Sequence, residues 1–152
     1  MNYLAFSAGF TLIHMVAYVA AGGVAFAISK DIYTEKARLM DYLRDMADPK
    51  DKAYVGKTFL VAQIPRGILM SAVLYPLLGV LGEVTLVGRF VFLGGLMLIY
   101  TEISSAIPFP TNLEGWVYMK PRYFQGRKIM KFWLEITLYS LLFALPAAWL
   151  LF

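Results

Sequence analysis

Residues 3–29, YLAFSAGFTLIHMVAYVAAGGVAFAIS, form an apolar stretch that contains no Asp, Glu, Lys or Arg. A helix needs about 20 residues to cross the hydrocarbon layer of a bilayer, which is roughly 30 Å thick. Three further stretches are long and apolar enough to do the same, namely 58–81, 85–107 and 129–152. The sequence therefore predicts an all-α integral membrane bundle of four transmembrane helices in up-down-up-down order.

The composition agrees with a membrane environment. Hydrophobic residues make up 60% of the 152 residues, and the mean hydropathy is +0.64. A soluble fold of this size leaves too much surface in water to accommodate that share. We expect a single transmembrane domain over 1–152, because no linker-like stretch divides the chain. The chain contains no cysteine, which excludes disulfides and cysteine-ligated metals within it.

The positions of the basic residues predict the topology. Seven of the fourteen Lys and Arg residues fall within 30–57 and five within 108–131. Under the positive-inside rule these two connecting loops are cytoplasmic, and both termini then lie outside. The positive charge is explained by topology, and a basic groove lined with stacking aromatics is missing, so we expect no nucleic-acid partner.

The first connection predicts an amphipathic cytoplasmic segment at about 31–48. The prolyl ring at Pro49 disfavours helical backbone at Asp48, so we expect the helix to stop there. The segment would lie on the membrane surface or on the bundle, or it would be a charged connector that extends the first span. Its apolar side chains share one helical face: Leu39, Met40, Leu43, Met46 and Ala47.

The other connection, about 108–128, predicts an interfacial loop. Its three prolines oppose a continuous helix, and Trp and Tyr favour the headgroup level of a bilayer. Such a loop serves as an anchor, or its cations contact a lipid headgroup or another anion. The candidate contacts are Lys120, Arg122, Arg127, Lys128 and Lys131.

Residues 110–142, PTNLEGWVYMKPRYFQGRKIMKFWLEITLYSLL, together with the start MNYLA, resemble a family of small four-span prokaryotic membrane proteins of unknown function. The resemblance implies a location in a prokaryotic plasma membrane. It implies no activity and no functional residues.

Polar residues predict a layer within the membrane. Ionisable groups at membrane depth are costly, so each needs a partner or a role. Counting about 1.5 Å per residue from the expected helix ends places the polar side chains of three helices in one layer near the cytoplasmic side. The layer contains Gln63, Arg66, Glu102, Ser105 and Glu135.

Within this layer we expect Arg66 to pair with Glu102 or Glu135, because a paired guanidinium and carboxylate both stay charged in a bundle. The second carboxylate would then be protonated, bind a cation, pair with a neighbouring subunit or extend to the interface. The layer is either a structural network or a site for a proton, an ion or a substrate.

The chain's single histidine, His14, lies on a predicted helix seam. The seam has 4-3-4-3-4 spacing, typical of the inward face of a left-handed bundle, and consists of Ser7, Thr11, His14, Tyr18, Ala21 and Ala25. Counted from the outer end, His14 lies about 16 Å deep. We expect His14 and Thr11 near the midplane, apart from the Arg66 layer. Packing, proton relay and haem ligation are the alternatives for His14.

The sequence contains no recognised catalytic constellation, metal site or cofactor motif. We therefore expect a non-enzymatic subunit or self-associating module that acts as a homo-oligomer or within a larger membrane complex. One alternative is an ion, proton or small-solute channel or transporter that uses Arg66, Glu102 and Glu135. Another is a membrane enzyme that acts on an anionic lipid or amphiphile through the cations of 108–131.

Overall fold

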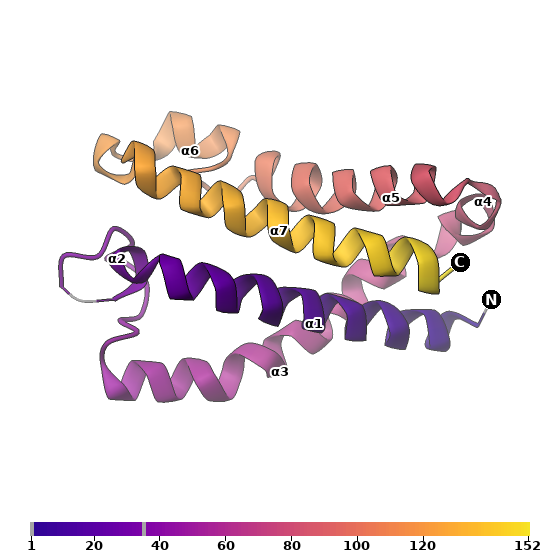
Figure 1. Cartoon of the computed structure of the whole chain (residues 1–152), viewed down its shortest axis with the longest axis horizontal. Helices are drawn as coiled ribbons and strands as arrows, with labels where there is room; N and C mark the ends of the chain where they lie inside the picture. The colour runs from indigo at the N-terminus through magenta and orange to yellow at the C-terminus, as the bar shows by residue number, and fades with distance from the viewer. Residues whose placement is uncertain (1, 35) are drawn as a thin grey trace.

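The structure is a computed structural model that describes residues 2–34 and 36–152, which fold into helices joined by turns and contain no strand (Figure 1). The elements in chain order are α1 (Tyr3–Ile28), α2 (Lys30–Tyr33), α3 (Pro49–Val73), the 3-10 helix η1 (Tyr75–Leu77), α4 (Leu78–Glu83), α5 (Leu86–Gly95), the π-helix η2 (Leu96–Ile103), α6 (Leu113–Tyr118), the 3-10 helix η3 (Pro121–Tyr123) and α7 (Gly126–Leu150).

Within the described residues, three helical segments are long and apolar enough to cross a membrane: Tyr3–Ile28, Leu86–Ile103 and Gly126–Leu150. A fourth span exists if α3 is counted together with η1 and α4, which continue it after a bend of 42°. Pro76 lies at this bend, where its ring and missing N–H interrupt a regular helix. The expected all-helical chain with several membrane-spanning helices is thus supported.

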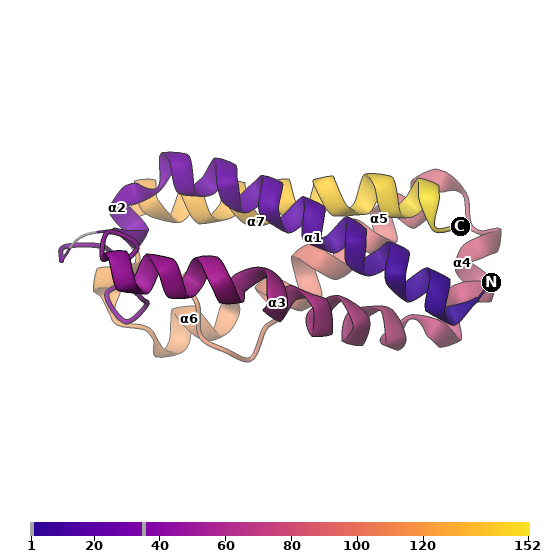
Figure 2. The same cartoon turned by 90° about the horizontal axis from the view of Figure 1, so that it is seen from below.

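The long helices lie side by side. Helix α1 packs along both α3 and α7, and α7 also packs along α5. Both termini lie at one end of the molecule, which we call the terminal end (Figures 1 and 2). The connecting residues 29–34, 36–48 and 104–125 lie at the opposite end, which we call the loop end (Figures 1 and 2).

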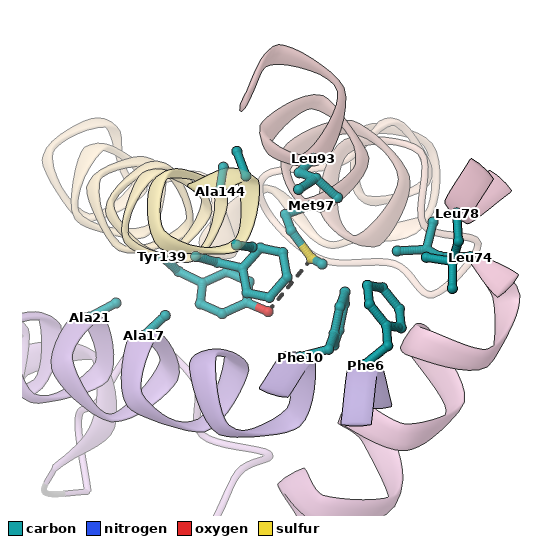
Figure 3. Close-up of a cluster of buried hydrophobic side chains, with 13 residues drawn as sticks. Phe6, Phe10, Ala17, Ala21, Leu74, Leu78, Leu93, Met97, Tyr139 and Ala144 are labelled. Atoms are coloured by element: carbon teal, nitrogen blue, oxygen red, sulfur yellow. Dashed lines mark hydrogen bonds between the residues drawn. The ribbon is translucent and has the colours of Figure 1, made fainter. Parts of the chain in front are cut away.

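The terminal end contains the main hydrophobic core, which draws side chains from α1, α5, α7 and the bend after α3 (Figure 3). The ring centroids of Phe10 and Phe143 lie 4.8 Å apart in a T-shaped contact, and Phe6 packs beside them. Leu93 and Met97 from the third span are fully buried against these rings. This end of the molecule is therefore closed by apolar packing.

The predicted seam of α1 is confirmed by burial. Five of its six members are buried, and Tyr18 is half-buried. A Cβ at Gly67 would approach within 2.8 Å of Thr11 Oγ1 and 3.0 Å of Thr11 Cα, so α1 and α3 touch closely there. Nearer the terminal end, the hydroxyls of Ser7 and Ser71 lie 2.7 Å apart. Small and polar residues thus join these two helices, as is common in membrane bundles.

The predicted amphipathic helix at 31–48 is wrong. Among the described residues of this range, α2 is the helical part, and 36–48 forms turns and irregular backbone. Asp48 begins the next helix instead of ending one, because its side chain accepts hydrogen bonds from the backbone N–H groups of Lys50 and Asp51. Pro49 fits the first helical position, where no N–H is required.

The apolar side chains of that segment separate into two groups. Leu39 and Met40 are buried with Ile32, Tyr123 and Phe132 in a second cluster at the loop end. Leu43 is 40% exposed, and Ala47 is also exposed. Met46 is half-buried, so the five side chains differ in burial and do not form one continuous apolar face.

The third span is irregular and shorter than expected. It begins as α5, continues as the π-helix η2, and ends at Ile103, although 85–107 was predicted. The segment 104–125 follows, and its helix α6 lies beyond the end of η2 towards the loop end (Figure 1). Glu102 is thus positioned by the last turn of a π-helix.

Candidate functional site

Three residues of the predicted polar layer line one cavity. Arg66 of α3, Glu102 of η2 and Glu135 of α7 enclose a space of about 50 Å³, which we call the polar chamber. A water molecule needs roughly 10–15 Å³ of such space, so the chamber has room for a few. The remaining lining residues are Tyr18, Ala21, Gly22, Ile136 and Tyr139.

The expected ion pair of Arg66 is not formed. In residues 2–34 and 36–152, four ion pairs have a nitrogen and an oxygen within 4.0 Å, and none of them includes Arg66, Glu102 or Glu135. These side chains lie around the chamber instead of closing it by direct contact. Three of the five residues expected in the polar layer line the chamber, but the sequence could not show that a cavity lies among them.

Tyr33 of α2 holds one carboxylate of the chamber. Its hydroxyl donates to Glu135 Oε2 over 3.1 Å. Burial raises the pKa of the Tyr33 hydroxyl, and the negative charge of Glu135 acts in the same direction, so Tyr33 remains a donor at neutral pH. Sequence reasoning missed Tyr33 because it lies outside the predicted spans.

His14 contacts the predicted layer, contrary to the expectation that it lies apart. Its Nε2 is 3.1 Å from Gln63 Oε1, and its Nδ1 is 2.7 Å from the hydroxyl of Tyr139. A neutral imidazole fits both contacts, with Nε2–H donating to the amide oxygen and Nδ1 accepting from the tyrosine O–H. Tyr139 also lines the polar chamber. His14 is fully buried, and Tyr139 connects it to the polar chamber.

The depth estimate failed because α3 begins earlier than expected. Gln63 is fourteen residues after Pro49, and His14 is fourteen residues before Ile28. At about 1.5 Å per residue both lie about 21 Å from the loop ends of their helices. The error came from counting α3 from Thr58, the start of the apolar stretch.

Two other predicted site residues lie outside the chamber. Ser105 follows the end of η2, and its hydroxyl accepts a hydrogen bond from the Ile107 N–H over 3.3 Å. Thr11 is buried at the close approach to Gly67, and its hydroxyl has no hydrogen-bond partner among the described residues.

The cations predicted for anion binding behave differently from one another. Arg122 pairs with Asp41 at 3.1 Å, and Lys131 pairs with Asp31 at 2.6 Å. The hydrogen bond to Tyr123 and the charge of Asp41 raise the pKa of Arg122. Lys120 and Arg127 are exposed, and Lys128 is half-buried. The two paired cations are already engaged by acids of the first connection, which weakens the anion-site interpretation.

A larger cavity lies between α1 and α3 at the loop end. Its volume is about 530 Å³, and we call it the loop-end cavity. It shares Tyr18, Gly22 and Glu135 with the polar chamber. Its other lining residues are Val19, Gly23, Phe26, Tyr33, Met46, Lys52, Val55, Gly56 and Phe59. The two cavities therefore adjoin at Glu135.

Comparisons with protein-family models, with curated proteins and with solved structures found no match. The resemblance to a four-span prokaryotic family gains no support from them. Within the described residues, no group of three or more His, Cys, Asp or Glu is arranged to hold a metal ion.

Proposed function

We propose that this chain is a non-enzymatic membrane protein whose polar chamber binds a proton or a small cation during ion-linked transport. The observation that carries the proposal is that Arg66, Glu102 and Glu135 line one cavity without a direct ion pair between them. A structural network would be expected to close such charges into contacts, because an unpaired charge at membrane depth is costly.

The charge of the chamber favours a positive occupant. Two carboxylates and one guanidinium leave one negative charge when all three are ionised. Binding a proton or a monovalent cation removes that excess. Neither carboxylate forms an ion pair within 4.0 Å in residues 2–34 and 36–152, so either can take up the proton or cation.

Access to the chamber differs between its two sides. Glu135 lines both the chamber and the loop-end cavity, so an ion arriving from the loop end meets this carboxylate first. Phe10, Phe143 and Met97 fill the path towards the terminal end. The geometry supports a state that is open towards the loop end and closed towards the terminal end.

Proton flux into liposomes tests the proposal. Purified protein is reconstituted with an internal pH-sensitive dye, and a potassium gradient with valinomycin drives protons inward. We expect Glu102→Gln and Glu135→Gln to reduce the protein-dependent flux by about tenfold or more, equivalent to about 1.4 kcal/mol in a rate-limiting step. Glu83→Gln is the matched control, because Glu83 is exposed at the terminal end. Equal flux in all four proteins would reject transport through this chamber.

We also propose an orientation of the chain in the membrane. We place both basic connections in the cytoplasm of a prokaryotic plasma membrane, with four spans in up-down-up-down order and the termini outside. The charge distribution supports this orientation. Because the chain has no cysteine, a single cysteine at Lys36 or Arg127 can be labelled from one side at a time. Labelling of either position from the outside of intact cells would reject the orientation.

A membrane subunit or homo-oligomer is the second candidate. In the apolar window of Leu86–Ile103, only 11% of the residues are buried inside the chain, so lipid or another protein covers this helix. The mass of the purified protein in detergent, measured by light scattering, tests the idea. A stable monomer without associated proteins would remove its basis. The enzyme alternative has no comparable support, since Arg122 and Lys131 already contact acids.

A further inference from the structure

The loop-end cavity is bordered by glycines that face open space. A Cβ built on Gly22, Gly23 or Gly56 would meet no atom within 4 Å. The first half of α3 separates from α1 towards the loop end, whereas the two helices cross closely near the middle of the molecule (Figure 1). These glycines therefore widen a space between two membrane-spanning helices instead of bringing their backbones together.

The wall of this cavity is mainly apolar, with two opposite charges. Val19, Phe26, Val55 and Phe59 supply hydrocarbon surface. Glu135 and Lys52 are the charged residues that line it, and no ion pair within 4.0 Å joins them in the described part of the chain. Tyr33 donates to one oxygen of Glu135, which leaves the other oxygen available to a second donor. An occupant that matches this wall has an apolar chain and both a positive and a negative group.

We propose that the loop-end cavity binds a membrane lipid whose zwitterionic headgroup carries a primary ammonium and a phosphate. When neither a proton nor another cation neutralises Glu135, the ammonium contacts this carboxylate. The phosphate contacts Lys52, and the first part of an acyl chain lies along Val55 and Phe59. A volume of about 530 Å³ falls within the usual range of roughly 300–1,000 Å³ for small-molecule sites. The lipid enters from the bilayer between α1 and α3, because α1 is a candidate membrane span and α3 becomes one when it is counted together with η1 and α4.

The chemistry of the ammonium group and of the Glu135 carboxylate explains the choice of headgroup. A primary ammonium has three N–H donors and forms a charge-assisted hydrogen bond with a carboxylate. A quaternary ammonium has no N–H donor and cannot form that bond. A lipid with an anionic headgroup would bring its negative charge to the cavity that contains Glu135. Phosphatidylethanolamine is therefore the preferred probe over phosphatidylcholine and phosphatidylglycerol.

Native mass spectrometry of protein released from nanodiscs tests the inference. The nanodiscs contain equimolar amounts of the three lipids, and the lipids retained by each protein molecule are counted. We expect phosphatidylethanolamine to be retained about tenfold more than either of the others, a preference of about 1.4 kcal/mol. Equal retention of phosphatidylcholine would overturn the assignment of the ammonium to Glu135.

A matched pair of glycine variants tests the location. Gly56→Leu places a side chain in the cavity and should abolish the retained lipid. Gly79→Leu is the control, because a Cβ there also meets no atom within 4 Å but lies in α4 at the terminal end. Retention by Gly56→Leu at the wild-type level would overturn the proposal. If Gly56→Leu melts well below the wild type, Lys52→Gln decides the question, because Lys52 is exposed and supports no core.

Variants of Lys52 and Glu135 test the phosphate contact and the ammonium contact one at a time. A variant of Glu102 tests whether lipid binding is independent of the proposed transport. We expect Lys52→Gln to reduce retention of phosphatidylethanolamine about tenfold, the loss of about 1.4 kcal/mol. Glu135→Gln should remove the preference for phosphatidylethanolamine over phosphatidylcholine. Glu102→Gln should keep the lipid, because Glu102 lines only the polar chamber of the two cavities. Lipid binding that survives without proton flux would reject the transport proposal alone, and flux without lipid preference would reject this one alone.

Discussion

The terminal end and the loop end of this molecule use the same two helices in opposite ways. Towards the terminal end, Gly67 allows the backbone of α3 to approach Thr11 of α1, and aromatic rings fill the space beside them. Towards the loop end, Gly22 and Gly56 border a cavity of about 530 Å³. Small residues in a membrane helix thus permit either close contact or an open cavity, and the distance between the two backbones decides which.

The contrast between a packed terminal end and an open loop end depends most on the packing of the terminal end. Phe10→Ala removes a fully buried ring that contacts Phe143 at 4.8 Å. We expect the free energy of unfolding to fall by about 3–5 kcal/mol, as is typical for Phe→Ala in a core. Denaturant titration in mixed micelles measures the loss. The control Val16→Ala, on the same helix but 62% exposed, should change it by about 0.5 kcal/mol or less. Similar losses in both variants would contradict the packed core.

Tyr139 belongs both to the core of the terminal end and to the wall of the polar chamber, so a variant at this position tests how the two are joined. Tyr139→Phe removes the hydroxyl that lies 2.7 Å from His14 Nδ1, so the buried imidazole loses a partner. An unsatisfied buried polar group costs about 1–3 kcal/mol, and we expect the same micelle titration to show a loss of this size. Tyr118→Phe is the control, because Tyr118 is 71% exposed. An unchanged free energy of unfolding in Tyr139→Phe would show that the contact between Tyr139 and His14 does not stabilise the fold.

The smallest expected effect concerns the start of α3 at the loop end. Asp48→Ala removes the side chain that accepts from the Lys50 and Asp51 N–H groups. We expect a loss of about 0.5–2 kcal/mol in the free energy of unfolding. Asp48→Asn retains a capping oxygen, so its free energy of unfolding should lie within about 0.3 kcal/mol of the wild-type value. If both variants behave alike, the cap does not define where α3 begins.

The regular parts of the fold were predictable from local patterns. Residues 3–29 and 129–152 predicted α1 and α7 closely, because long apolar stretches leave few alternatives to a spanning helix. The seam through His14 was also predictable, because helical periodicity alone determines which residues share a face. The span from 58 was placed nine residues late, since a charged first half of a helix does not appear in an apolar pattern.

Three of the five residues expected in the polar layer line the chamber, whereas the geometry of the chamber could not be predicted. Arg66, Glu102 and Glu135 stood out because charge is rare in apolar stretches. Their separation around a chamber depends on how α3, η2 and α7 pack, which no local pattern encodes. The same reason explains the error at 31–48, where tertiary contacts of Leu39 and Met40 replaced the expected helix.

The π-helix η2 gives the third span an unusual tolerance of the loss of one residue. A π-turn carries about one more residue than an α-turn, so Leu96–Ile103 contains a surplus that ordinary helical winding would not need. Removing one residue before Glu102 would let the segment wind as an α-helix. A π-turn spreads its 360° over about one residue more than an α-turn, so removing that residue while the segment winds as an α-helix leaves the residues after it facing almost the same way. We therefore expect a single-codon deletion between Leu96 and Glu102 to preserve both the hydrophobicity of the span and the place of the Glu102 carboxylate in the polar chamber.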